Sequence, residues 1–347
     1  MVATTIRGRM MDWFIAAPFI RSPSNHWLTD FVPGQRGSFH SIPANYRHDR
    51  SRPATGLRDW VDYFQHGAAA WHATSSSGKP SGILTCFPQL PLTIGLHKRL
   101  SRHKPPLIAW TFNLGTLPGG AKRALAMAGL AVVNRFIVHS RAEIAACSEW
   151  LQLPTERFEF VPLQRGMRDI TLAEDRDHPF VLSMGSAHRD YRLLFSVLAE
   201  LGYPAVVVAG PHAVAGLSVP ANVELRSGLT IEDCHKLLQR ARLNVIPVAN
   251  RKTASGQVTL IDAMMYARPT IATACPASVD YVEHGKDGWL VQVGDHDDMK
   301  TSIQRLWEDA PLRAGLGSAG RQTAVERFSD PAIGRVLGRI LKQHENN

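Results

Sequence analysis

The sequence predicts an α/β protein built from two Rossmann-like domains that face each other across a cleft. Its 347 residues are too many for one ordinary core and suit two domains of roughly 150 residues each. In the C-terminal half, short apolar runs alternate with apolar residues at helical spacing, which is typical of a doubly wound parallel sheet.

The C-terminal half gives the clearest elements. Phe180-Val-Leu-Ser-Met is an apolar run that ends at Gly185, so it is expected to be a buried strand. After it, apolar residues recur at helical spacing through Leu201, and Thr230 is a suitable N-cap for a later helix. The expected strands are 180–184, 205–209, 223–225, 243–248, 270–273 and 288–291, and the expected helices are 191–201, 231–241, 255–267, 295–306 and 312–328.

The N-terminal half is less regular. Its expected strands are 10–20, 107–111, 135–138 and 158–161, with a helix that starts at Ser140 through a capping-box pattern. Two Pro-, Ser- and Gly-containing stretches, 21–53 and 74–80, are expected to be surface loops. A polar stretch at 163–178 is the candidate linker. We therefore expect an N-terminal domain at 1–165, a C-terminal domain at 166–330 and a helical tail at 331–347 that crosses back onto the first domain.

Charge is distributed unevenly. Residues 1–170 hold 20 Lys+Arg and 10 Asp+Glu, whereas residues 171–347 hold 19 and 20. A basic half points to an anionic partner, such as a membrane surface, an acidic substrate or nucleic acid. The four cysteines are isolated in the sequence, which signals neither a zinc site nor a disulfide framework and suits a reducing compartment. No apolar run reaches the roughly 20 residues of a membrane span.

The basic residues concentrate around 96–104, in a predicted amphipathic helix that also carries Leu96 and Leu100. Such a surface suits anionic lipid, so we expect peripheral association with the inner face of the cytoplasmic membrane. The alternative is a solvated helix face. Nucleic acid is not expected, because there is no recognition module or aromatic stacking run. The residues proposed to face the membrane or acceptor are Lys98, Arg99, Arg102 and Lys104.

The strongest functional signal is the segment 253–265. It follows a predicted strand and leads into a helix, and ligands of open parallel sheets bind beyond the carboxyl ends of strands. A helix N-terminus there offers free N–H groups to a phosphate, and Ser255 and Gly256 allow the backbone to approach closely. Asp262, the one acidic residue in an apolar run, is placed to hydrogen-bond a ribose.

Residues 254–273, 280–285 and 288–291 together resemble retaining glycosyltransferases of family 4, which have the GT-B architecture. The resemblance implies that Asp262 holds the nucleotide ribose and that amides of 256–259 cradle the donor. The family's first acidic position falls on Ala254, which is a departure. The implied donor-binding residues are Gly185, Ser186, Arg189, Ser255, Gly256, Gln257, Val258, Thr259 and Asp262.

The resemblance also implies catalytic roles. Arg189 is expected to neutralise the leaving diphosphate, and the family's other basic position falls on Ser186, so Arg251 or Lys252 is expected to compensate. Asn113, at the end of a strand in the first domain, matches a position that often carries a donor-contacting histidine. No protein nucleophile is required, because the leaving phosphate is thought to act on the acceptor hydroxyl.

The expected function is therefore transfer of a hexose or hexuronic acid with retention of configuration. The expected donor is a UDP-linked sugar, and the expected acceptor is a membrane lipid or a lipid-linked saccharide. Neither a metal nor another cofactor is expected. A dehydrogenase or epimerase is disfavoured, since neither half has a Gly-x-Gly-x-x-Gly turn after its first strand. A non-catalytic nucleotide-sugar-binding protein remains the alternative, because of Ala254 and Ser186.

Overall fold

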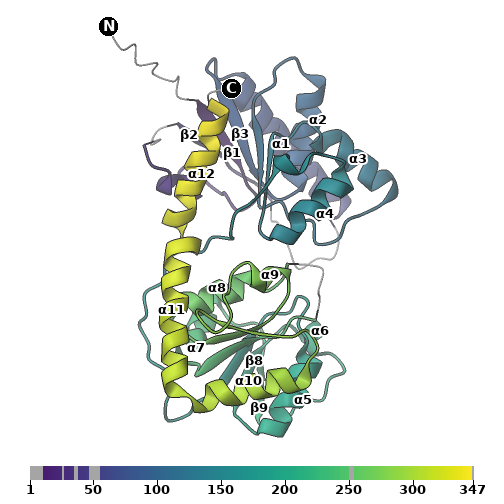
Figure 1. The fold of residues 1–347 in the computed structure, drawn as a ribbon. Coiled ribbons are helices and arrows are strands. Elements are labelled where there is room, and N and C mark those ends of the chain that lie inside the picture. The colour runs from purple at the N-terminus through teal and green to yellow at the C-terminus, as the bar shows by residue number, and fades with distance from the viewer. Residues whose placement is uncertain (1–10, 26, 35–37, 47–54, 250–253, 346–347) are drawn as a thin grey trace. The chain divides into compact units, whose positions relative to one another are not determined.

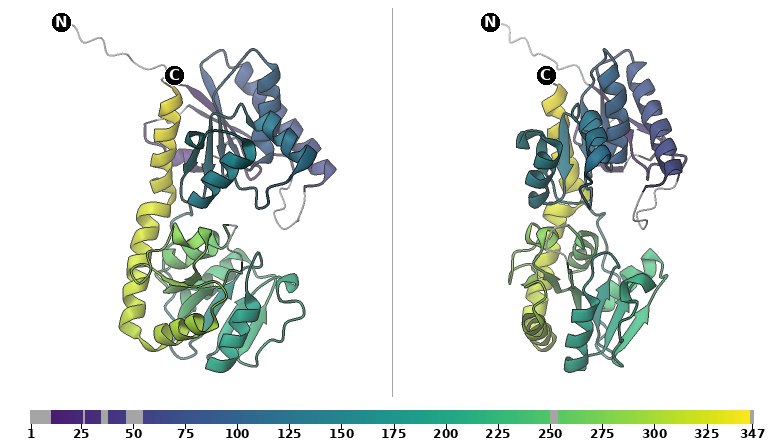
Figure 2. Two further views of the ribbon diagram at one scale, coloured as in Figure 1. Left: turned by 45° about the vertical axis from the view of Figure 1, so that its right-hand side comes forward. Right: turned by 90° about the vertical axis from the view of Figure 1, so that its right-hand side faces the viewer.

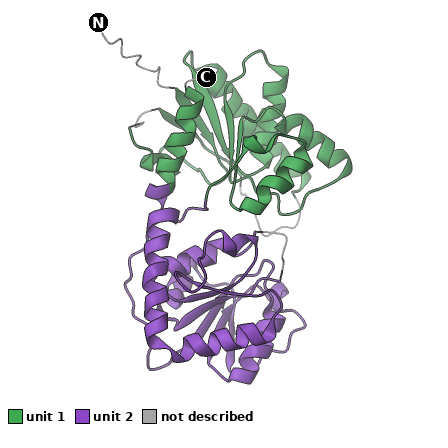
Figure 3. Cartoon of the chain, in the orientation of Figure 1, with its two compact units in different colours: residues 1–161, 333–347 green, residues 162–332 purple. Residues whose placement is uncertain are grey.

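The computed structural model describes residues 11–25, 27–34, 38–46, 55–249 and 254–345 (Figure 1). The chain divides into two compact units, coloured separately in Figure 3. Unit 1 comprises residues 1–161 and 333–347, and unit 2 comprises residues 162–332. The C-terminal segment thus belongs to the same unit as the N-terminal half.

Unit 1 contains a six-stranded sheet in the order β2-β1-β3-β4-β5-β6, and each pair of neighbours is parallel. The strands are short and mostly buried, as expected for strands covered on both faces. Their bounds are β1 Asp12–Ala16, β2 Phe39–Ile42, β3 Ser81–Cys86, β4 Leu107–Trp110, β5 Arg135–Val138 and β6 Phe158–Phe160.

Alternate residues of the central strands pack into two separate cores, one on each face of the unit 1 sheet. Ile83 contributes to the core formed with the first four helices, and Leu84 to the opposite core, where the C-terminal helix packs. Figure 2 shows helices on both sides of the strands. The helices are α1 Leu57–Ser75, α2 Gln89–Leu100, α3 Gly120–Leu130, α4 Arg141–Leu151 and α12 Asp330–Glu345, with 3-10 turns η1 Trp27–Phe31 and η2 Thr155–Arg157.

Unit 2 has a second parallel six-stranded sheet, in the order β12-β11-β10-β7-β8-β9. Its strands are β7 Val181–Met184, β8 Ala205–Val208, β9 Val223–Arg226, β10 Leu243–Ile246, β11 Thr270–Thr273 and β12 Trp289–Val291. Its helices are α5 Tyr191–Leu201, α6 Pro211–Val214, α7 Ile231–Arg240, α8 Gln257–Met265, α9 Pro276–Val279, α10 His296–Glu308 and α11 Ala310–Phe328. Both units are therefore doubly wound α/β units, and the predicted fold class is confirmed.

One expectation for the N-terminal half was wrong, and one expected loop begins two residues later than predicted. Residues 39–42, expected in a loop, form the edge strand β2 against β1. Their burial is only partial and their run is four residues long, so the sequence carries little strand signal. At residues 74–80, helix α1 continues to Ser75 before the loop begins.

Candidate functional site

Strands β7 and β10 lie side by side at the point where the strand order of the unit 2 sheet reverses. From β7 the chain builds outward through β8 and β9, and from β10 it builds the other way through β11 and β12. Crevices for ligands in open α/β sheets form at such switch points, beyond the carboxyl ends of the strands. The loop after β7 and the loop that leads from β10 into α8 meet there: Ala249 N donates to His188 O at 3.0 Å, and Ser255 Oγ donates to Ala187 O at 3.0 Å.

Arg189 lies at the centre of this junction. Its Nε donates to Met184 O at 3.2 Å, at the end of β7. Its Nη1 donates to Ala187 O at 2.9 Å and to Ser255 Oγ at 3.3 Å. The guanidinium thus joins the two loops that sequence reasoning assigned to the donor site.

Two glycines make room for this guanidinium. Gly185 has φ +113°, and a Cβ there would lie 2.6 Å from Nη2 of Arg189. Gly256, the N-cap of α8, has φ +94°, and a Cβ there would lie 3.0 Å from Ile246 Cγ2 and 3.6 Å from Nη1 of Arg189. Both positions need a residue without a side chain, because of their left-handed backbone and because of the close approach.

The positive charge of Arg189 has no acidic counterpart in the part of the chain that the structure describes. Its acceptors are two carbonyls and a hydroxyl, and Nη2 has no acceptor among the described residues. Burial lowers the pKa of Arg189, although an arginine stays charged at neutral pH. A half-buried cation of this kind, beside the N-terminus of α8 and the positive end of its helix dipole, is suited to an anion.

Asp262 is buried on α8, two turns from the junction, and has a partner that the sequence did not reveal. Arg165 donates to it with both Nε (2.8 Å) and Nη2 (2.9 Å). His235, on α7, places Nε2 at 3.8 Å from the same carboxylate. Nothing in the sequence links these three residues, since Arg165 lies in the predicted linker, 97 positions before Asp262.

The other predicted donor-binding residues lie around the same junction. Ser186 Oγ accepts from Gly210 N at 2.8 Å, in the loop after β8. In the first turns of α8, Gln257 is buried, Val258 is 43% exposed and Thr259 is half-buried. Lys252 and Arg251, expected to compensate for Ser186, lie outside the described residues.

Asn113 lies in unit 1, just beyond the carboxyl end of β4. Its Oδ1 accepts from Gly115 N at 2.9 Å, so the side chain closes its own loop. Thr111, immediately before it, has φ +53°, a conformation that is uncommon for a residue other than glycine. The loop is therefore tightly shaped, with the amide carbonyl of Asn113 used within it.

The predicted membrane-facing set needs a correction. Lys98 is only 5% exposed, and its Nζ donates to Val132 O at 2.9 Å and Asn134 Oδ1 at 2.7 Å. Burial lowers the pKa of Lys98 to about 8, helped by the charges of Lys104 and Arg157. Lys98 was assigned to the exposed face because helical spacing does not show that a neighbouring helix, α3, covers this side of α2.

The other three basic residues are exposed, together with Leu100, which is 89% exposed. Two of them are tethered to backbone carbonyls: Arg99 Nη1 donates to Ala128 O at 3.1 Å, and Lys104 Nζ donates to Lys98 O at 2.6 Å. No described helix is both long and apolar enough to cross a membrane.

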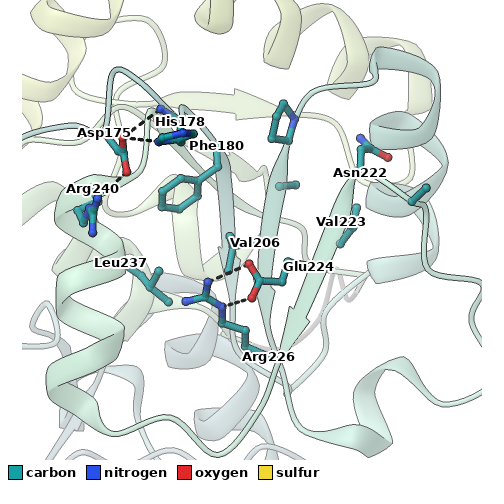
Figure 4. A pocket seen from close by; sticks show the side chains of 13 residues that line it. Asp175, His178, Phe180, Val206, Asn222, Val223, Glu224, Arg226, Leu237 and Arg240 are labelled. Carbon is teal, nitrogen blue, oxygen red and sulfur yellow. Dashed lines mark hydrogen bonds and ion pairs between the residues drawn. The ribbon is translucent and has the colours of Figure 1, made fainter.

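A hollow of about 610 Å³ lies at the opposite end of the unit 2 sheet, near the amino ends of β7, β8 and β9 (Figure 4). Phe180, Val206 and Leu237 form part of its apolar lining. Its two arginines are paired, Arg226 with Glu224 at 2.7 Å and Arg240 with Asp175 at 2.6 Å. It therefore lacks the uncompensated charge that distinguishes the junction at Arg189. Among the described residues, no three His, Cys, Asp or Glu side chains are grouped so as to hold a metal ion.

Comparison with known proteins concerns mainly the C-terminal half of the chain. Residues 195–309 match the family described as glycosyl transferases group 1, a segment that includes β10 and α8. Unit 2 thus contains a region similar to a glycosyltransferase group 1 domain. The chain is 30% identical over 95 residues to the capsular polysaccharide biosynthesis glycosyltransferase CapM of Staphylococcus aureus, a match to 27% of this chain and 25% of CapM. The chain thus matches about a quarter of the length of this relative.

Solved structures extend the likeness to the whole fold. Anabaena Alr3699/HepE, solved in complex with UDP, has a TM-score of 0.68 at 16% identity, covering 96% of this chain and 100% of that one. The lipopolysaccharide outer core galactosyltransferase WaaB, in its apo form, has a TM-score of 0.67 at 12% identity, with the same coverage. The glycosyltransferase group 1 region therefore lies in a chain whose two-sheet fold matches GT-B glycosyltransferase structures.

Proposed function

We propose that this protein is a nucleotide-sugar-dependent glycosyltransferase whose donor diphosphate binds at the junction of β7, β10 and α8. The observation that carries the proposal is Arg189, a half-buried cation whose acceptors among the described residues are all neutral and which lies beside a helix N-terminus. The group 1 match over residues 195–309 supports the same reaction class.

In the proposed reaction, the bond between the anomeric carbon of the sugar and the diphosphate oxygen breaks, and the acceptor hydroxyl oxygen bonds to the anomeric carbon. Negative charge grows on the leaving diphosphate, and Arg189 and the first amides of α8 stabilise it. The diphosphate oxygen takes the proton of the acceptor hydroxyl, so the chain needs no catalytic base. We further propose that configuration is retained.

The diphosphate charge is met in this proposal by Arg189 and by the dipole of α8, without a metal ion. We propose a UDP-linked hexose or hexuronic acid as the donor, in line with the UDP named in the Alr3699/HepE structure. Full activity is then expected after treatment with excess EDTA. Loss of activity that only added Mg²⁺ or Mn²⁺ restores would contradict this part of the proposal.

For the acceptor we propose a lipid or a lipid-linked saccharide, in polysaccharide or glycolipid synthesis, at the inner face of the cytoplasmic membrane. The capsular polysaccharide enzyme CapM and the lipopolysaccharide enzyme WaaB support this class. In unit 1, Leu100 is an exposed apolar side chain among basic neighbours, a combination suited to the surface of an anionic bilayer.

The decisive experiment incubates the protein with a panel of nucleotide sugars, with and without a membrane lipid extract, and identifies products by mass. A glycosylated lipid product together with slow donor hydrolysis in its absence is expected. Donor binding without hydrolysis or transfer would instead identify a non-catalytic nucleotide-sugar-binding protein, the alternative favoured by the missing carboxylate at Ala254. The Arg189→Met variant is the matched negative control.

A further inference from the structure

The ion pair between Arg165 and Asp262 joins the segment that enters unit 2 to the helix of the candidate donor site. Both carboxylate oxygens are engaged, Oδ1 by Nε at 2.8 Å and Oδ2 by Nη2 at 2.9 Å. This two-point geometry fixes the plane of the carboxylate as well as its position, which a single-point contact does not do.

Arg165 is itself held in place. Its backbone N–H donates to Phe328 O at 2.8 Å, and Leu163 N, two residues earlier, donates to the hydroxyl of Tyr281 at 2.8 Å. Burial lowers the pKa of Arg165, but its hydrogen bonds to Asp262 and the charge of that carboxylate outweigh burial, so the net shift is upward. Arg165 is thus a fixed cation.

Among the residues that the structure describes, Asp262 has one permanently charged ion-pair partner, Arg165. The pKa of His235 is lowered by burial, with smaller contributions from the charges of Arg168 and Arg165, although Asp262 acts in the opposite direction. The imidazole is therefore neutral at neutral pH, and its Nε2 lies beyond hydrogen-bond distance, at 3.8 Å. Arg165 is the residue that sets where the carboxylate oxygens point.

The position of Asp262 on α8 fits the order of groups in a nucleoside diphosphate. It lies six residues beyond Gly256, or about 9 Å along the helix axis at about 1.5 Å per residue. A diphosphate at the N-terminus of α8 would thus be followed by a ribose near this carboxylate. Each carboxylate oxygen has a second lone pair, so the bonds to Arg165 do not exhaust its capacity to accept a ribose hydroxyl.

We propose that Arg165 is a positioning residue, which aims the Asp262 carboxylate at the ribose hydroxyls and gives this site its preference for ribonucleotides over 2′-deoxyribonucleotides. The inference rests on the proposed function, because it takes a nucleoside diphosphate as the ligand. It concerns Arg165 acting through Asp262, since Arg165 itself need not touch the ligand.

The test measures affinity by calorimetry for UDP, GDP and ADP, and then for the 2′-deoxy form of the nucleotide that binds best. Wild-type protein is expected to bind the deoxy form about 10- to 100-fold more weakly, as expected for the loss of one hydrogen bond to a charged group. In Arg165→Met the ratio of the two dissociation constants, deoxy form over ribonucleotide, is expected to fall to within about threefold. In Arg165→Lys the same ratio should take an intermediate value.

The controls separate positioning from folding. Arg242→Met removes an arginine of similar exposure, whose Nε donates to Glu174 at 3.0 Å at the amino end of β10, and it should keep the wild-type ratio. The double variant Arg165→Met/Asp262→Asn avoids a buried unpaired carboxylate. Its ratio should equal that of Asp262→Asn alone, because Arg165 acts through Asp262.

Four outcomes would overturn the inference. A folded Arg165→Met protein that keeps the full preference, or a double variant whose ratio differs from that of Asp262→Asn, would show that Arg165 does not aim Asp262. Equal affinity of the wild-type protein for the ribonucleotide and its 2′-deoxy form would overturn this inference but leave the proposed function standing. Absence of binding of any nucleoside diphosphate by folded wild-type protein would overturn both.

Discussion

Replacement of Arg189 by methionine tests the proposed catalytic centre directly. The substitution keeps an unbranched side chain and removes the guanidinium with its charge, together with its bonds to Met184 O, Ala187 O and Ser255 Oγ. The nitrogen with no acceptor among the described residues, Nη2, is the group available to a diphosphate oxygen. Removing a single charge-assisted bond should cost about 1.5–3 kcal/mol, or about 10- to 150-fold in rate.

The loss should fall mainly on kcat. Charge builds on the diphosphate as the glycosidic bond breaks, so the cation stabilises the transition state more than the bound donor. The assay is steady-state kinetics with varied donor, alongside the Tm of each variant, because Arg189 also joins the loops after β7 and β10. Arg192→Met is the matched control, an exposed arginine three residues further on, and it should behave as wild type.

Two results would refute this reasoning. An Arg189→Met protein with unchanged kcat would show that the guanidinium does not face the leaving group. An equal loss in Arg192→Met would show that the effect is a general one of charge. Arg189→Lys should recover part of the rate, since it restores the charge without the planar geometry.

Three further predictions follow from the same structure. Gly256→Ala should lower Tm and weaken UDP binding, because a residue with a side chain at φ +94° costs about 1–2 kcal/mol; unchanged Tm and affinity would contradict the left-handed N-cap of α8. The pKa of Lys98 in the folded protein, about 8, lies below its ordinary value of 10.5. Between these two pH values the unfolded chain therefore binds more protons than the folded protein, and burial of Lys98 destabilises the fold least at high pH. The free energy of unfolding of wild type relative to Lys98→Met, measured with urea, should therefore rise between pH 8 and 10.5 by on the order of 3 kcal/mol. A difference between the two proteins that does not change with pH would refute the burial of a charged Lys98. Leu100→Asp should reduce co-sedimentation with anionic vesicles, whereas Lys98→Met should not, and equal partitioning of Leu100→Asp and wild type would argue against a bilayer contact here.

The unit 2 fold was largely predictable from sequence because its elements are strongly patterned. The helix at 191–201 and the strand at 270–273 have the predicted bounds, and Thr230 caps α7 by accepting from Asp233 N at 3.1 Å. The edge strand β2 could not be found in the same way. Its identity depends on pairing with β1, a tertiary contact that a four-residue, half-buried run does not encode.

The candidate site divides along a similar line. A glycine and a helix start predict a phosphate loop at Gly256 from local pattern, whereas Gly185 and Arg189 were predicted from the family resemblance. The partners of these residues come from elsewhere in the chain and have no local signature. Arg165 reaches Asp262 across 97 positions, and Arg189 reaches Ser255 across 66. The sequence therefore identifies the loops, while the fold decides which charges remain uncompensated.

The basic half of the chain shows why a count of charges does not define a surface. Lys98 and Lys104 donate to backbone carbonyls or, for Lys98, a side-chain amide, and Arg123 and Arg157 likewise bind the carbonyls of Trp150 and Ala131. A carbonyl is a dipole without net charge, so it fixes the position of a cation without neutralising it. The excess of 20 basic over 10 acidic residues in 1–170 thus persists as a long-range field. Attraction of the protein to an anionic surface should therefore depend on ionic strength, because the Debye length falls from about 10 Å at 0.1 M to about 3 Å at 1 M salt. Insertion into the bilayer should depend instead on the few side chains, such as Leu100, that are both apolar and exposed.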